Sequence, residues 1–140
     1  MLVLVTPAVP AAWHEKLEVV GFTVKVVEEL TEFWWGKHER CQSYEPDQHD
    51  RWGHEATKLR LWQLEEFEQL LYIDADAVLL APADSLFALR TFAAERGVMH
   101  SHFNAGVMLV HPSRQLFSAL LDRGGHDPPN LFGNVVDCTE

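Results

Sequence analysis

The sequence predicts a single α/β domain, and short apolar segments carry that prediction. Leu2-Val3-Leu4-Val5 has no polar alternation, which is typical of a buried strand in a parallel sheet. A segment with helical spacing and then an alternating segment follow it, in the order of a βαβ unit. Further apolar runs lie at residues 70–80 and 107–110. The 140 residues are enough to bury one core.

The first helix is expected directly after the first strand. Pro10 is suited to the first helical position, and Gly21 is suited to the C′ position that follows a helix. Between them, three apolar residues recur at spacings of four and three and therefore share one helical face. They are Trp13, Leu17 and Val20. Alternation over residues 22–27 then predicts a second strand, nearer a sheet edge.

The segment from Glu28 to Gly53 has no clear period and is rich in charge, histidine and tryptophan. A loop of this length inside a compact domain is usually functional or disordered. The pair Trp34-Trp35 can form a stacking platform for a sugar. Such a pair more often anchors a loop on the core, and we favour that interpretation.

The centre of the chain joins a helix to an acidic strand. Residues 57–66 are expected to be helical, and residues 70–80 are apolar on both sides of Asp74 and Asp76. On an extended backbone, side chains two apart point to the same face, so both carboxylates can reach one object. Carboxylates that close repel each other unless a cation lies between them, and an oxygen-seeking divalent cation fits that place. An isolated Asp-x-Asp is usually a polar turn, but the apolar context favours a site.

The remaining elements are a turn, a strand and a helix. Asp84 is expected to be an N-cap, residues 91–94 are ambiguous, and residues 107–110 form a buried strand. Ser113 is suited to cap a helix with four apolar residues. They are Leu116, Phe117, Leu120 and Leu121. Residues 1–122 are therefore the expected domain, and residues 123–140 an irregular tail.

The composition excludes some classes of partner. With a net charge of −10, the chain should not bind nucleic acid or an anionic membrane through bulk electrostatics. Cys41 and Cys138 are too few for a disulfide framework and are expected to be unrelated thiols. No apolar run approaches the roughly 18 residues of a membrane span, and no basic leader is visible. The compartment stays open between the cytosol, which we favour, and a Golgi lumen reached through an anchor elsewhere. No pattern addresses the oligomeric state.

Four short segments occur in a specific order and spacing. They are Thr57-Lys58-Leu59, Asp74-Ala75-Asp76, Asp84-Ser85-Leu86-Phe87 and Asn104-Ala105-Gly106. Together they resemble the family 8 glycosyltransferases, the glycogenin-like group with the GT-A fold, over about residues 2–122. The resemblance implies a GT-A-like, Rossmann-like, mostly parallel sheet that is flanked by helices and incomplete at both ends.

The resemblance also implies a site. Family members transfer a hexose from a nucleotide sugar, here expected to be a UDP-sugar, to an acceptor that the sequence does not identify, with retention of configuration. Asp74 and Asp76 would hold manganese or magnesium against the diphosphate. Lys58 and Ala75 belong to the implied donor-binding set. The segment Asn104-Ala105-Gly106 would lie beside the donor sugar, where an amide can bond hydroxyls and glycine permits close approach.

Departures from the family pattern leave alternatives open. The family domain has an earlier strand and later metal-site segments that are not found here, and His126 and Asp127 are not assigned to those roles. We therefore expect part of a domain, from a truncated or a degenerate copy, that binds metal and donor weakly. One alternative is a catalytically inactive GT-A scaffold or partner-binding module. A second is a haloacid-dehalogenase-like phosphatase, which is disfavoured because no lysine follows Asp84.

Overall fold

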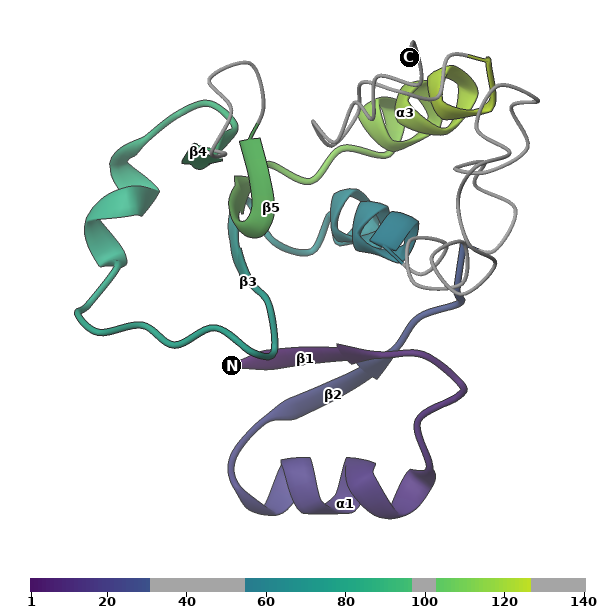
Figure 1. Ribbon diagram of the computed structural model, residues 1–140, viewed down its shortest axis with the longest axis vertical. Helices are drawn as coiled ribbons and strands as arrows, with labels where there is room; N and C mark the ends of the chain where they lie inside the picture. The colour runs from purple at the N-terminus through teal and green to yellow at the C-terminus, as the bar shows by residue number, and fades with distance from the viewer. Residues whose placement is uncertain (31–54, 97–102, 127–140) are drawn as a thin grey trace, which may run out of the picture.

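The computed structural model describes residues 1–30, 55–96 and 103–126, and Figure 1 shows how their elements are arranged. In chain order the elements are β1 (Leu2–Val5), α1 (Ala11–Val19), β2 (Thr23–Val26), η2 (Glu55–Gln63), β3 (Leu70–Ile73), η3 (Asp84–Ala88), β4 (Ala93–Arg96), β5 (Phe103–Val110) and α3 (Arg114–His126), where η denotes a 3-10 helix. The alternation of strands and helices confirms the predicted α/β class.

The first three elements form the predicted βαβ unit. β1 and β2 pair in parallel along their whole length, from Leu2 opposite Thr23 onward. Pro10 is the N-cap, so α1 begins one residue later than expected. Gly21 has a φ of +95° and ends the helix, because its N–H and that of Phe22 bond back to carbonyls of the last turn.

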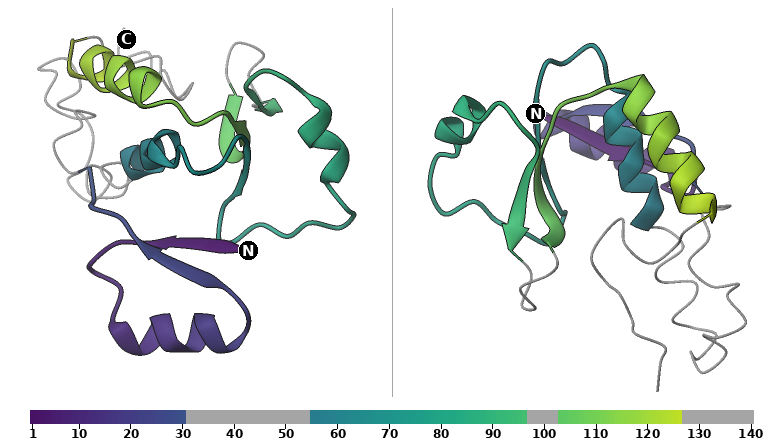
Figure 2. Two further views of the ribbon diagram at one scale, coloured as in Figure 1. Left: turned by 180° about the vertical axis from the view of Figure 1, so that it is seen from behind. Right: turned by 90° about the horizontal axis from the view of Figure 1, so that it is seen from above.

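Two of the three residues on the apolar face of α1 are exposed in the part of the chain that the structure describes, and Leu17 is half-buried. α1 buries none of its side chains, and Trp13 is 55% exposed and Val20 69% exposed. The views of Figures 1 and 2 place α1 on the outer side of β1 and β2, away from the other helices. The helical spacing therefore predicted the element correctly, although the face that it marks does not pack into the core.

A second sheet has the order β3-β5-β4, and both of its strand pairs are antiparallel. Among the strands that the structure describes, parallel pairing is thus confined to β1 and β2. The register between β4 and β5 shifts, because Ala94 lies opposite Met108 whereas Glu95 lies opposite Asn104. Residues 105–107 of β5 consequently have no partner in β4, which is the geometry of a β-bulge.

The core lies where η2 and α3 pack beside this sheet. Figure 2 shows η2 and α3 side by side. The buried cluster takes residues from η2 and its end, from β5 and from α3. They are Leu59, Leu61, Trp62, Leu64, Met108, Val110 and Phe117. As predicted, Ser113 caps α3, because its Oγ accepts a hydrogen bond of 3.2 Å from the Leu116 N–H.

Several expected boundaries move. β3 ends at Ile73, and a hydrogen bond of 3.0 Å from the Ala77 N–H to the Asp74 carbonyl turns the chain there. The apolar run at residues 78–80, expected to be buried, is exposed. The N-cap of η3 is Ala83, so the prediction for Asp84 was wrong by one position. α3 continues four residues past residue 122, where the tail was expected to begin.

Some predicted features lie outside the described residues. They are the Trp34-Trp35 pair, both cysteines and residues 127–140 of the expected tail.

An ion pair joins β2 to the turn that follows η2, since Lys25 Nζ donates to the Glu66 carboxylate. This hydrogen bond holds the pKa of Glu66 below its ordinary value of 4.5. A carboxyl whose pKa is lowered by folding contributes stability above its unfolded pKa and loses it as the pH falls through the folded value. Lys25→Met should therefore lower the urea midpoint slightly near neutral pH and leave it unchanged at about pH 2. An equal loss at both pH values would contradict the assignment.

Candidate functional site

Asp74 is anchored where the second sheet meets a turn. Its N–H donates a hydrogen bond of 2.8 Å to the Gly106 carbonyl, which extends the β3–β5 ladder by one residue into the bulge. The turn to Ala77 begins at the same residue. Asp74 is therefore fixed at the end of its strand, with its side chain 29% exposed.

Lys58 reaches Asp74 from η2. Its Nζ lies 2.9 Å from Asp74 Oδ1 and 3.2 Å from Oδ2, and it lies 2.6 Å from Glu55 Oε2. Glu55 and Lys58 fall on the same side of η2 because a 3-10 helix repeats every three residues. One ammonium group is thus shared by two carboxylates, with the Lys58 side chain only 14% exposed.

The charge of Lys58 is stabilised by this arrangement. Burial lowers the pKa of the Lys58 ammonium, but its hydrogen bonds with Glu55 and Asp74 outweigh that effect. The result is a pKa above the ordinary value of 10.5, so Lys58 is a permanent cation at neutral pH.

Tyr72 is a member of the site that the sequence did not reveal. Its hydroxyl donates a hydrogen bond of 2.5 Å to Asp74 Oδ1. Burial first, and then the hydrogen bond to Asp74, raise the pKa of Tyr72, so the phenol stays neutral and keeps its proton. Glu55 was missed as well. Residue spacing was the sequence signal that could have indicated both residues. Residues 72 and 74 share a strand face, and residues 55 and 58 share a face of a 3-10 helix.

Asn104 and Gly106 border Asp74 from β5. The Asn104 Oδ1 accepts a hydrogen bond of 2.7 Å from the Gly106 N–H. A Cβ placed on Gly106 would lie 2.9 Å from Asn104 Oδ1 and 3.2 Å from Asp74 Oδ2. Glycine therefore lets the two polar side chains approach the backbone at this point, and Asn104 remains exposed to solvent.

We expect Gly106→Ala to displace the Asn104 carboxamide, because the added Cβ would come within 3.0 Å of its oxygen. Loss of the Asn104–Gly106 hydrogen bond should lower the free energy of unfolding by about 1 kcal/mol. Urea denaturation would measure the change, with Asn104→Ala as the matched variant that lacks the same bond. The double variant should cost no more than about 0.5 kcal/mol beyond Gly106→Ala, and full additivity would contradict the mechanism.

The other predicted site residues are less central. Ala75 and Asp76 lie in the exposed turn, so Asp74 and Asp76 do not share a face of an extended strand as the sequence suggested. Asp76 still contributes to the raised pKa of Tyr72, which places its charge in the neighbourhood. Ala105 packs against the core. These contacts bring Lys58, Asp74, Asn104 and Gly106 together, with Asp76 beside them.

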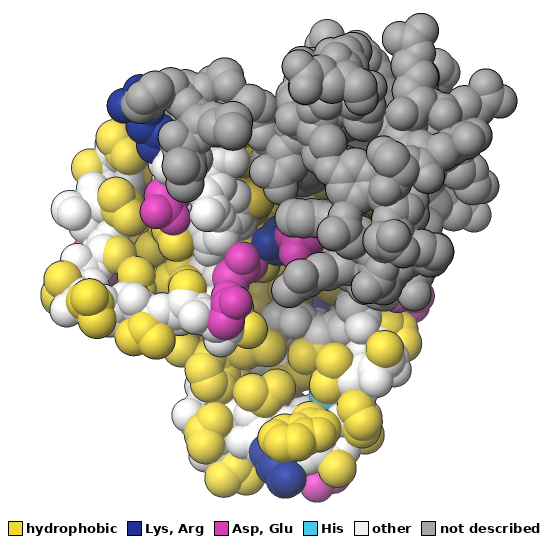
Figure 3. Space-filling view, viewed as in Figure 1, with side chains coloured by type: hydrophobic (Ala, Val, Ile, Leu, Met, Phe, Trp, Pro, Cys, Tyr) yellow, Lys and Arg dark blue, Asp and Glu magenta, His cyan; other side chains and the backbone are white. Residues whose placement is uncertain are grey.

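The carboxylates match a hard divalent cation in kind, because Mg²⁺ and Mn²⁺ prefer oxygen ligands. Within the described ranges, no three His, Cys, Asp or Glu side chains are arranged to hold a metal ion. Both oxygens of Asp74 also contact Lys58. Figure 3 shows acidic and basic side chains close together near the middle of one face. Asp74 and Asp76 therefore provide a partial ligand set that a diphosphate and water would have to complete.

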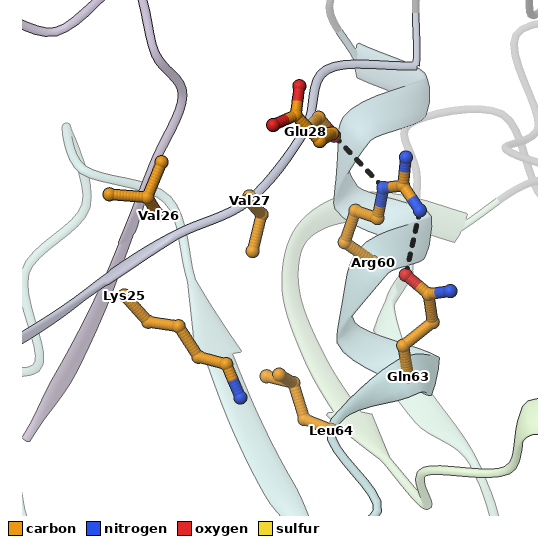
Figure 4. Close-up of a pocket in the computed structure, with 7 residues that line it drawn as sticks. All are labelled: Lys25, Val26, Val27, Glu28, Arg60, Gln63 and Leu64. Atoms are coloured by element: carbon orange, nitrogen blue, oxygen red, sulfur yellow. Dashed lines mark hydrogen bonds between the residues drawn. The ribbon is translucent and has the colours of Figure 1, made fainter.

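A cavity of about 260 Å³ lies on another side of η2 (Figure 4). It is lined by Lys25, Val26, Val27, Glu28, Arg60, Gln63 and Leu64. Arg60 is fixed there by its hydrogen bonds to the Glu28 carbonyl and to Gln63 Oε1. Neither Lys58 nor Asp74 lines this cavity. We therefore place the candidate functional site at the end of β3 rather than in the cavity.

Comparisons with known proteins identify relatives. The chain is 27% identical over 122 residues to UDP-glucuronate:xylan alpha-glucuronosyltransferase 1 of Arabidopsis thaliana, an alignment covering 87% of this chain and 17% of that protein. It is 38% identical over 77 residues to the putative UDP-glucuronate:xylan alpha-glucuronosyltransferase 3 of the same plant, covering 55% and 12%. It is 33% identical over 67 residues to glycogenin-1 of Caenorhabditis elegans, covering 47% and 16%. No protein-family model matches the chain.

These relatives are family 8 glycosyltransferases, so the resemblance that the motifs suggested is confirmed. The chain spans less than a fifth of their length, at 17%, 12% and 16%. In the part of the chain that the structure describes, every helix is too short or too polar to cross a membrane.

Proposed function

We propose, on the premise of this homology to family 8 glycosyltransferases, that the chain is the donor-binding part of a hexosyltransferase. The donor is a nucleotide-diphosphate sugar, and a UDP-sugar is favoured because the names of the plant relatives specify UDP-glucuronate. The reaction transfers the sugar to a glycosyl acceptor with retention of configuration. One observation carries the proposal: Lys58, Asp74 and Gly106 come from three separate segments and meet at one point.

The residues present define the roles in this proposal. Asp74 and Asp76 would hold a manganese or magnesium ion, which when bound offsets the charge that develops on the departing diphosphate. Lys58 supplies a fixed positive charge beside Asp74, in a chain whose net charge is −10. Asn104 is exposed next to Gly106, and its amide N–H₂ can donate to sugar hydroxyls.

The partial ligand set also limits activity. Two carboxylates, one of them already paired with Lys58, should bind the metal–donor complex weakly in this chain alone. A metal-dependent donor-hydrolysis screen across nucleotide sugars, run with the chain extended to full domain length, tests the function. We expect manganese-dependent release of UDP from a UDP-hexose, with a product of unchanged anomeric configuration by NMR.

The same screen separates the alternatives. An inactive scaffold would release no nucleotide with any donor, even at full length. A phosphatase of the haloacid-dehalogenase kind would form a phospho-enzyme that is lost in Asp74→Asn. The relatives reported above are glycosyltransferases, which favours sugar transfer over both.

A further inference from the structure

Lys58 is placed between two acids rather than on one. Its Nζ is closer to Glu55 Oε2, at 2.6 Å, than to either oxygen of Asp74, at 2.9 and 3.2 Å. Glu55 is more exposed than Lys58, with side chains 41% and 14% exposed, so Glu55 closes the outer side of the pair. The ammonium is therefore divided between an acid of the proposed metal site and an acid outside the Asp-x-Asp segment.

The sharing of Lys58 by two acids sets the net charge of the group around a bound metal ion. Glu55, Asp74 and Asp76 are carboxylates and Lys58 is an ammonium, so the group carries a net charge of two negatives. The hydroxyl of Tyr72 adds no charge, because it remains protonated. A divalent cation would bring the group to neutrality. Without the Glu55 charge, the group would carry a net charge of only one negative. The cation would then bind Asp74 while the Lys58 ammonium lies 2.9 Å from the same carboxylate.

We propose that Glu55 is a positioning residue for metal binding. It compensates the charge of Lys58, so that Asp74 can bind a divalent cation next to a lysine. This inference rests on the proposed function, since it assigns a role around the same Asp74, but it concerns a residue outside the family motifs quoted above. Glu55 acts through Lys58 and does not itself contact the metal.

Calorimetric titration of the chain with MnCl₂, in the absence of any nucleotide sugar, tests this role. Glu55→Gln should weaken manganese binding about tenfold, and Lys58→Met should strengthen it by a similar factor, because nearby charges act on the metal with opposite signs. The double variant Glu55→Gln/Lys58→Met restores the net charge of two negatives and should bind within about threefold of the unchanged chain. Glu55→Asp keeps the charge and should retain most of the affinity.

Matched controls separate this effect from general ones. Glu68→Gln removes one negative charge at the opposite end of β3, where Glu68 is 88% exposed, and should leave manganese binding unchanged. Circular dichroism of each variant would show whether it is folded. Because Glu55 lies partly exposed at the start of η2, its substitution should leave the core intact.

The outcomes distinguish this inference from the proposed function. If manganese binding is lost in Asp74→Asn but unchanged in Glu55→Gln, the metal site stands and the role of Glu55 is overturned. If the double variant binds as weakly as Glu55→Gln, Glu55 contacts the metal directly, and the charge-compensation role is wrong. If the unchanged chain does not bind manganese at all, the role of Glu55 is overturned, whereas the proposed function is decided separately by the donor-hydrolysis screen at full domain length.

Discussion

Asp74→Asn is expected to lower manganese-dependent release of UDP from a UDP-sugar by at least about a hundredfold in the full-length domain. The substitution removes the charge that pairs with Lys58 Nζ at 2.9 Å and that the proposed metal site would need. It preserves the backbone hydrogen bond to the Gly106 carbonyl, so the end of β3 should keep its position. Initial rates at saturating donor, with metal concentration varied, would measure the effect.

Asp84→Asn is the matched control for this prediction. Asp84 lies exposed in the first turn of η3. Its substitution by asparagine removes the same charge by the same chemical change. Its rate should stay within about twofold of the unchanged domain, as for surface substitutions away from functional groups. Equal losses in the two variants would show that Asp74 acts only through the overall charge.

Leu59→Ala is expected to have the largest effect on stability, lowering the free energy of unfolding by about 2 to 5 kcal/mol. Leu59 is 1% exposed and lies in the cluster formed by η2, β5 and α3. Truncation removes buried apolar surface and leaves a cavity that the neighbouring side chains cannot fully close. Urea denaturation followed by circular dichroism would measure the change in midpoint and slope.

Leu116→Ala makes the same chemical change at a different depth. Leu116 lies on α3 and is 45% exposed, so its truncation should cost less than about 1 kcal/mol. A similar loss for both variants would contradict the position of the core between η2 and α3. Because Leu59 is the neighbour of Lys58 in η2, a large loss in Leu59→Ala should also weaken manganese binding at temperatures close to unfolding.

Local pattern was sufficient for several elements of the fold. The uninterrupted apolar run of β1, the helical spacing of α1 with Gly21 at its end, and the Ser113 cap of α3 depend on neighbours within a few residues. The length of β3 was overestimated because a strand continues only while it has a partner, and its ladder with β5 ends at Asp74 and Gly106. Residues 78–80 are as apolar as a strand, yet they are exposed.

Within the candidate site, sequence motifs marked Lys58, Asp74, Asn104 and Gly106, which the fold then brings together. Motif order can mark such residues because each motif is a short local string. It cannot show which neighbours complete their hydrogen bonds, and so Tyr72 and Glu55 were found only from coordinates.

Apolar period and motif spacing were thus enough to establish the α/β class, the strand that leads to Asp74 and the relationship to family 8 glycosyltransferases. The antiparallel order β3-β5-β4, the bulge at Gly106 and the sharing of Lys58 between Glu55 and Asp74 emerged from the folded chain. The reason is physical: strand register and ion pairing join residues distant in sequence, and their free energies depend on geometry that no local pattern encodes.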